Sequence, residues 1–262
     1  MIFNRKSYII SKDNFDEEVA FMLEVTLTKA VERYLSDTFC CTAEELSKAD
    51  VLFAVNPNAD EPYMKIMTYK NCVVVSTSAD MSARVKGFLA GKTRDEIFEC
   101  PLVYGQTIHY IPDITKMKEA ELPDGFAYEL LEGKEINKLS HVQGFDNSLV
   151  FDENSNISTK IVFAAKEGDQ VIAIAGAGIV TDKLWEVGID VLPGYRNNGL
   201  GSILVSALTA VILKKGVIPF YSASVTNIGS QRVAGRAGYV PSWVDTFGNV
   251  YDENYAYKTS IV

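Results

Sequence analysis

The stretch from Val191 to Lys215, VLPGYRNNGLGSILVSALTAVILKK, decides the fold, because one element ends within it and another begins. A strand is predicted to end at Pro193, a glycine-rich turn follows over residues 196–201, and a long apolar helix is predicted over residues 199–215. The unpaired amides and the positive dipole at a helix N-terminus favour anions, and a diphosphate in particular. The sequence therefore predicts a phosphate-binding turn here.

The composition indicates an acidic globular protein of 262 residues, with 47% hydrophobic side chains, 23% charged side chains and a formal net charge of −9. The length favours two domains, each able to bury a core. No basic patch is evident, so nucleic-acid binding is not expected, whereas the negative charge suits a cationic or amine substrate. No signal peptide and no apolar run of about 20 residues are found, so we expect a cytoplasmic protein that binds no membrane.

The chain has four cysteines, and none has the spacing of a metal site: Cys40, Cys41, Cys72 and Cys100. We expect them to be reduced and mostly buried, although the adjacent Cys40 and Cys41 leave a reactive pair open. The two histidines, His109 and His141, are interpreted as packed or surface residues, because neither belongs to a catalytic or metal-binding pattern. No metal site is predicted.

Residues 1–120 are predicted to form a smaller mixed α/β domain of unassigned role. Its expected elements are helices over 14–35, 79–90 and 93–99 and strands over 51–55, 63–69 and 72–76. Asp13 is the expected cap of the first helix, and the last two strands are expected to form a hairpin. Three prolines interrupt the periodicity over residues 101–125, and we place the domain boundary within this segment, between residues 120 and 121.

Residues 121–262 are predicted to form a second domain in which strands and helices are mixed. The expected strands span 126–131, 159–166, 170–180, 183–191, 217–224 and 239–247, and the expected helices span 134–142, 199–215 and 228–237. This order predicts an α/β fold, with helices on the faces of a mixed α+β sheet.

The run VIAIAGAGIV, residues 171–180, is a second glycine-containing segment. Gly176 and Gly178 follow an apolar run, as in a dinucleotide-binding turn, but the third glycine would fall at Thr181 and no helix follows. We therefore interpret the run as a strand lined by small residues, and NAD binding is not favoured. An oxidoreductase or a kinase that binds a nucleotide at the turn 196–201 stays open as an alternative.

One strand after the turn comes the segment ASVTNIGSQRVAGRAGYV, residues 223–240. In it, Asn227 is followed at offsets of three, six, eleven and twelve residues by Ser230, Val233, Gly238 and Tyr239. Together with the Arg-x-x-Gly-x-Gly turn, this segment resembles the GNAT family of acyl-CoA-dependent N-acyltransferases. The resemblance covers residues 126–247 and implies a GNAT-like fold for the second domain, with coenzyme A (CoA) as the ligand of the turn.

The resemblance also implies how acetyl-CoA is held as cosubstrate. Backbone amides would bind the CoA pyrophosphate at Asn197, Asn198, Gly199, Leu200, Gly201 and Ser202. Arg196 would add its charge or shape the turn. The strand Trp185–Val191 would diverge from the next strand at a bulge, so that main-chain groups of Ile189 and Val191 bind pantetheine. Asn227 would lie beside the cofactor with Ser230.

Acyl transfer requires a base for the amine, stabilisation of the oxyanion and a proton for the departing thiolate. Glu186 and Asp190 share one face of the predicted strand, and we favour Glu186 as the base because the family often places a carboxylate there; a solvated polar face is the alternative. Many family members carry Tyr seven residues after Asn227, where this chain has Ala234. Tyr221 is the candidate acid in its place, and a core aromatic or a proton from water are the alternatives.

The sequence thus predicts an enzyme that transfers an acetyl group from acetyl-CoA to a primary amine of an unidentified small molecule or peptide. A non-catalytic CoA-binding or regulatory module is the alternative, favoured by Ala234 and by the lack of a motif in residues 1–120. Three roles are open for that first domain: shaping the acceptor pocket, forming a homodimer, or a structural role.

Overall fold

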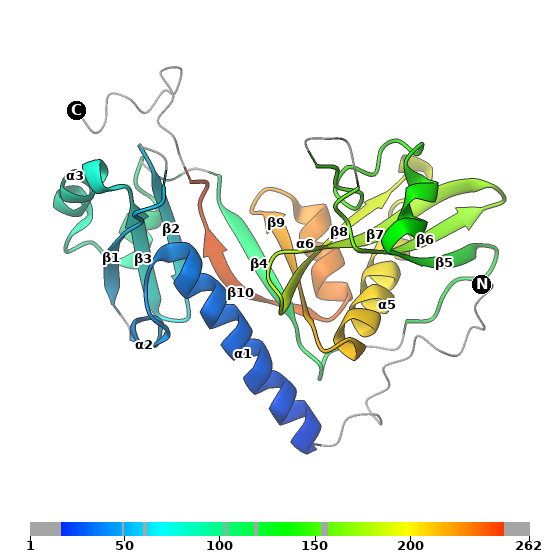
Figure 1. Cartoon of the computed structure of the whole chain (residues 1–262), viewed down its shortest axis with the longest axis horizontal. Helices are drawn as coiled ribbons and strands as arrows, with labels where there is room; N and C mark the ends of the chain where they lie inside the picture. Colours follow the sequence, from blue (N-terminus) through cyan, green and yellow to red (C-terminus); the bar gives the residue numbers. More distant parts are fainter. Residues whose placement is uncertain are drawn as a thin grey trace. The chain divides into compact units, whose positions relative to one another are not determined.

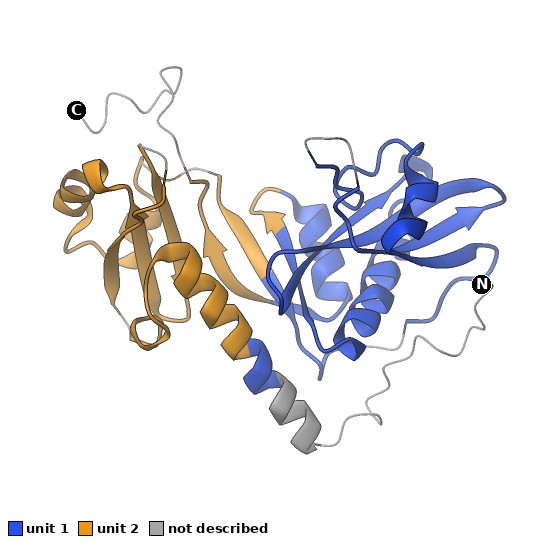
Figure 2. Cartoon of the chain, in the orientation of Figure 1, with its two compact units in different colours: residues 1–27, 110–222, 227–240 blue, residues 28–109, 223–226, 241–262 orange. Residues whose placement is uncertain are grey.

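The computed structural model describes residues 17–248, apart from residues 49, 60, 61, 102, 104, 118, 119 and 153–156. The chain divides into two compact units (Figure 2). Unit 1 comprises residues 1–27, 110–222 and 227–240, and unit 2 comprises residues 28–109, 223–226 and 241–262. Each unit therefore gathers segments that are distant in the sequence, and the boundary between residues 120 and 121 stays a prediction.

Unit 1 is built on a sheet with the strand order β5-β6-β7-β8-β9. These strands are β5 (Ala127–Glu132), β6 (Ile161–Glu167), β7 (Gln170–Ile179), β8 (Leu184–Val191) and β9 (Ile218–Ser224). From β5 to β8 the neighbours pair antiparallel, whereas β8 and β9 pair in parallel. A parallel pair needs a crossover connection, which the helix α5 (Leu200–Lys214) supplies.

The two faces of this sheet are covered by different elements. On one face, the 3₁₀ helix η2 (Gly133–Leu139) helps to enclose a buried core of Leu131, Ile136, Leu139, Phe145, Leu149, Val162, Ala164 and Ile174. On the other face, α5 packs against β6, β7 and β8 and contacts α6 (Ile228–Arg236) (Figure 1). Because side chains alternate along β8, Asp190 faces the η2 side while Ile189 and Val191 face α5.

Unit 2 has a run of paired strands and its own core. The strands β1 (Val51–Val55), β3 (Cys72–Thr77) and β2 (Met64–Tyr69) lie in that order, and residues 243–245 of β10 (Tyr239–Asp245) pair with β2. Its helices are α2 (Ala43–Leu46), α3 (Ala79–Leu89), α4 (Arg94–Phe98) and the part of α1 (Glu17–Phe39) from residue 28 onward. Their core is formed by Met64, Ile66, Val73, Val75, Met81, Val85, Leu89, Ile97 and Cys100.

The mixed α/β fold class is confirmed, and most expected elements occur within a few residues of their predicted bounds. The predicted hairpin of β2 and β3 is present, with Lys70 in the left-handed region at φ 53°. The helix expected over 134–142 is instead the 3₁₀ helix η2. The strand β4 (Thr107–Pro112) was not predicted, because it lies in the proline-interrupted segment 101–125 and ends at Pro112 itself. The expected cap Asp13 lies outside the described residues.

In the described part of the chain, no helix has the length and hydropathy of a membrane-spanning segment.

Candidate functional site

The candidate site begins where β8 and β9 separate. Their parallel pairing runs over four positions and ends at Val187 and Tyr221, whereas β8 stays paired with β7 as far as Val191. The main chain of residues 188–191 is therefore not paired with β9 and has an open edge, as the resemblance implies. The register of β8 with β7 is continuous, so the expected bulge is absent from this pairing and the separation occurs on the β9 side alone.

The turn after β8 exposes a group of backbone amides. The guanidinium Nε of Arg196 donates to the carbonyl of Val191 at 2.7 Å and so fixes the turn to the end of the strand. Asn197 and Gly199 both adopt positive φ, at 66° and 81°, and Gly199 is the N-cap of α5. The first backbone hydrogen bond of α5 is donated by the amide of Ile203. Within the described chain, the amides of residues 197–202 therefore donate no hydrogen bond. These amides and the helix dipole create an electropositive site for an anion.

Gly201 allows the start of α5 to lie directly against β8. A Cβ at this position would lie 3.3 Å from the side chain of Val191 and 3.4 Å from that of Ile189, at the lower limit of ordinary packing. An added methyl group would therefore require these side chains or the helix start to move by a few tenths of an ångström. The glycine pattern of the turn thus has two functions: Gly199 provides the left-handed cap, and Gly201 provides the close approach.

The start of α6 forms the opposite wall. Asn227 is the N-cap, and its side chain accepts a hydrogen bond from the amide of Ser230 at 3.0 Å. The Ser230 hydroxyl is in turn 2.6 Å from the hydroxyl of Tyr221 on β9. Burial raises the pKa of Tyr221, whose side chain is 2% exposed, so this hydroxyl stays protonated at neutral pH.

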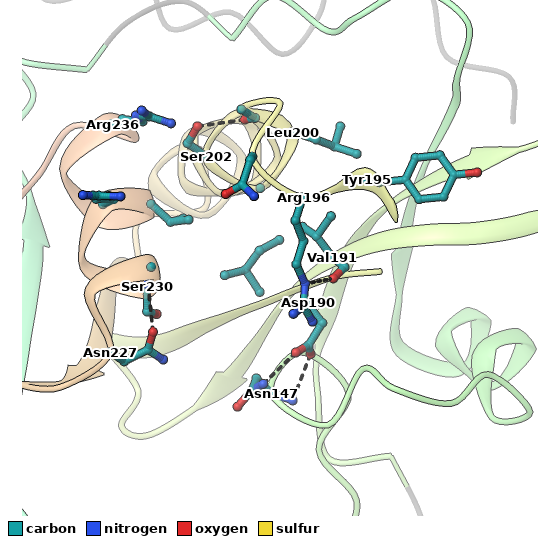
Figure 3. Close-up of a pocket in the computed structure, with 17 residues that line it drawn as sticks. Asn147, Asp190, Val191, Tyr195, Arg196, Leu200, Ser202, Asn227, Ser230 and Arg236 are labelled. Atoms are coloured by element: carbon teal, nitrogen blue, oxygen red, sulfur yellow. Dashed lines mark hydrogen bonds between the residues drawn. The ribbon is translucent and has the colours of Figure 1, made fainter. Parts of the chain in front are cut away.

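Between these walls lies a cavity of about 470 Å³ (Figure 3). Of the residues predicted to bind the cofactor, all except Asn198 line it. Its lining comprises Asn147, Ile189, Asp190, Val191, Tyr195, Arg196, Asn197, Gly199, Leu200, Gly201, Ser202, Asn227, Gly229, Ser230, Arg232, Val233 and Arg236. The predicted catalytic residues Glu186 and Tyr221 are outside this lining, and the sequence interpretation overlooked Asn147, Tyr195 and the arginines of α6.

The cavity has a positive lining in a protein of net negative charge. Arg196, Arg232 and Arg236 line it, whereas Asp190 is the one carboxylate in the lining. In the described residues, no group of three or more histidine, cysteine or acidic side chains could hold a metal ion. The arrangement is therefore suited to binding an anionic organic ligand.

Glu186 lies just before the separation of the strands, on the same face of β8 as Asp190. Its carboxylate accepts a hydrogen bond from the hydroxyl of Ser222 on β9, and its side chain is partly buried. Through Ser222 the carboxylate is oriented at the closed end of the gap between β8 and β9. A carboxylate in this position can accept a proton from a group bound where β8 and β9 separate.

Asp190 has a different environment, because its carboxylate accepts four hydrogen bonds. Asn147 donates two of them, from its backbone amide at 2.9 Å and from its side chain at 2.6 Å (Figure 3). Ser148 donates the other two, from its backbone amide at 2.9 Å and from its hydroxyl at 2.8 Å. Gly176 and Gly188, opposite each other on β7 and β8, let this loop lie flat on the sheet. A Cβ at either glycine would overlap the carbonyl oxygen of Ser148 or Asn147. The contacts of Asp190 thus fasten the loop to β8.

The histidines, Ala234 and the cysteines that the sequence singled out do not line the cavity. The Nε2 of His109 lies 3.0 Å from a carboxylate oxygen of Asp245 in unit 2, and the ring stacks on Trp243. His141 is exposed. Ala234, at the position where the family often has Tyr, is fully buried. The four cysteines form no disulfide.

Comparison with known families gives a match for part of the chain. The model of the acetyltransferase (GNAT) family matches residues 128–239. These residues include the separated strands, the turn 196–202 and α6. No curated protein matches the chain.

Several solved structures are similar to the chain at low identity. A GNAT-family acetyltransferase from Colwellia psychrerythraea is 14% identical over 56% of this chain and 57% of its own, with a TM-score of 0.41. A GCN5-related N-acetyltransferase from Kribbella flavida is 17% identical over 56% of this chain and 58% of its own, with a TM-score of 0.42. A GCN5-related N-acetyltransferase-like protein from Streptococcus suis is 16% identical over 69% of this chain and 72% of its own, with a TM-score of 0.40.

Proposed function

Since residues 128–239 form a domain of the GNAT acetyltransferase family, we propose that the protein transfers an acetyl group from acetyl-CoA to a primary amine. The observation that carries the proposal is the open edge of β8 beside the unpaired amides of residues 197–202. An open strand edge can pair with the amides of pantetheine, and the helix start can bind the diphosphate. The cavity of about 470 Å³ is of a size usual for small-ligand sites.

The residues present fit CoA in charge as well as in shape. The diphosphate is anionic, and the turn offers it amides that have no acceptor in the described chain, together with the positive end of α5. Arg196 supports the turn through the carbonyl of Val191. When bound, CoA supplies an acyl group activated as a thioester.

We assign the proton transfers to Glu186 and to the pair of Tyr221 and Ser230. The amine nitrogen forms a bond with the acyl carbon, the bond from that carbon to sulfur breaks, and CoA leaves as a thiolate. Glu186 accepts the proton that the amine loses. Ser230, which lines the cavity, passes a proton to the thiolate and recovers it from Tyr221, 2.6 Å away. Tyr221 then regains a proton from solvent, and Glu186 releases to solvent the proton it accepted. In this assignment Asp190 is a positioning residue, because its four hydrogen bonds hold the loop at Asn147.

A non-catalytic CoA-binding module is the second candidate, and Ala234 is the observation that favours it. A tyrosine that is common in the family is replaced by a fully buried alanine, so any acid must come from another position. The two candidates share the binding site and differ only in turnover. The roles open for residues 1–120, in the acceptor pocket or in a homodimer, likewise stay proposals.

Acetyl transfer to a panel of amines separates the two candidates. The full chain is expected to release CoA in the presence of an accepted amine, and Glu186→Gln should reduce kcat/KM by about a hundredfold or more while acetyl-CoA still binds. Asp169→Asn, at an exposed turn outside the cavity, is the matched control and should leave turnover unchanged. Binding of acetyl-CoA without turnover on any amine would favour the regulatory module.

A further inference from the structure

One stripe of α6 faces the cavity and carries two arginines. Gly229, Ser230, Arg232, Val233 and Arg236 line the cavity, and their spacing of three to four residues places them on one side of the helix. Figure 3 shows Arg236 at the opposite end of α6 from the cap Asn227. The stripe therefore adds two arginines to the part of the segment Asn227–Tyr239 that lines the cavity.

The stripe lies next to the start of α5. A Cβ built on Gly201 would be 3.8 Å from the side chain of Val233. Arg232 and Arg236 flank Val233 on the helix and are both exposed. The two guanidinium groups are thus attached beside the turn that offers its amides to an anion.

Neither arginine has an acidic partner in the described chain, although the protein carries 34 acidic and 25 basic residues. Like charges four residues apart repel each other and destabilise a helix. Arg236 lies in the last turn, where the helix dipole favours a cation, but Arg232 lies in the middle of the helix and gains little from it. A bound anion would relieve this repulsion.

If the amides of residues 197–202 bind the diphosphate, a different anionic group must bind the two arginines. CoA carries a further phosphate, on the 3′ carbon of its ribose. Resting on the proposed function, we propose that Arg232 and Arg236 bind this 3′-phosphate and make the site selective for CoA over acyl donors that lack it. Guanidinium groups suit this role because they bind phosphate oxygens through two parallel hydrogen bonds.

Calorimetric titration of the full chain with CoA and with 3′-dephospho-CoA tests the assignment. We expect CoA to bind about tenfold more tightly than dephospho-CoA. In Arg232→Gln and Arg236→Gln this preference should shrink, because CoA binding weakens while dephospho-CoA binding stays the same. Arg33→Gln, which removes an arginine of α1 outside the cavity, should keep the preference.

Arg232→Lys and Arg236→Lys serve as conservative variants, and circular dichroism checks that each variant is folded. They should keep part of the preference, because they keep the charge and lose the paired hydrogen bonds. Equal affinity of the unaltered chain for both ligands would overturn the assignment, and so would arginine variants that weaken both ligands equally, which would place the arginines on the diphosphate. Failure of both ligands to bind would instead contradict the proposed function.

Discussion

Val187 of β8 and Tyr221 of β9 are the last residues that the two parallel strands pair with each other. Beyond them β8 continues for four residues with one edge open, and the turn that follows presents the amides of residues 197–202. Tyr221 also contacts Ser230 at the start of α6. The point of separation therefore connects the strand edge, the turn and the proposed proton donor.

Asp190→Asn should destabilise unit 1 without altering the turn. The amide side chain has one acceptor oxygen instead of two, so its NH₂ group would face either the side-chain amide of Asn147 or the three other donors of Asn147 and Ser148. We expect the free energy of unfolding to fall by about 1–3 kcal/mol, measured by urea denaturation. Asp182→Asn, at an exposed position in the turn before β8, is the control. An Asp190→Asn protein as stable as the control would contradict the positioning role.

Gly176→Ala should displace the loop that Asp190 holds. The new Cβ would overlap the carbonyl oxygen of Ser148, so the loop must move away from the sheet. A loss of about 1–3 kcal/mol in stability is expected, with faster amide exchange at residues 145–150. Gly178→Ala is a close control on the same strand, because its new methyl group would enter open space. Equal exchange in the two variants would show that the loop does not rest on Gly176.

Tyr221→Phe should lower turnover and leave binding unchanged. The substitution removes the hydroxyl that contacts Ser230, so kcat on an accepted amine should fall roughly 10- to 100-fold while the Kd for acetyl-CoA stays the same. Tyr239→Phe is the control, because its buried hydroxyl contacts Thr209 and it does not line the cavity. If the two variants lose turnover to the same extent, the proton does not come from Tyr221.

The buried hydroxyl of Tyr221 should also affect how the free energy of unfolding depends on pH above pH 10. Burial raises the pKa of Tyr221 above the value near 10 of an unfolded tyrosine. A raised pKa contributes stability that is complete below the unfolded value and is lost as the pH rises through the folded value. The free energy of unfolding should therefore fall less steeply above pH 10 in Tyr221→Phe than in the unaltered chain. Identical slopes would contradict the shift.

Those parts of the site that depend on local sequence could be predicted. The turn 196–201 and the cap Asn227 have residue types that backbone geometry requires, since Gly199 needs positive φ and Asn227 accepts an amide at a helix start. The strand–turn–helix order follows from hydrophobic periodicity in the same way. These features involve residues only a few positions apart.

The parts that sequence reasoning missed depend on contacts between distant segments. Asp190 accepts hydrogen bonds from residues 147 and 148, more than forty positions away in the sequence. The hydrophobic periodicity does not indicate that this loop lies against Gly176 and Gly188. The sequence alone therefore predicts Asp190 as a catalytic candidate, through the strand face that it shares with Glu186. The arginine stripe of α6 has a sequence signal, the spacing of Arg232 and Arg236, but its meaning depends on which side of α6 faces α5.

Titration of the full chain with acetyl-CoA tests most directly the claim that the open edge of β8 and the turn 197–202 form a CoA site. We expect saturable binding at one site, and at a ligand concentration one hundred times Kd the native state should gain about 2.7 kcal/mol. Absence of binding heat, together with an unchanged Tm at millimolar acetyl-CoA, would contradict the account.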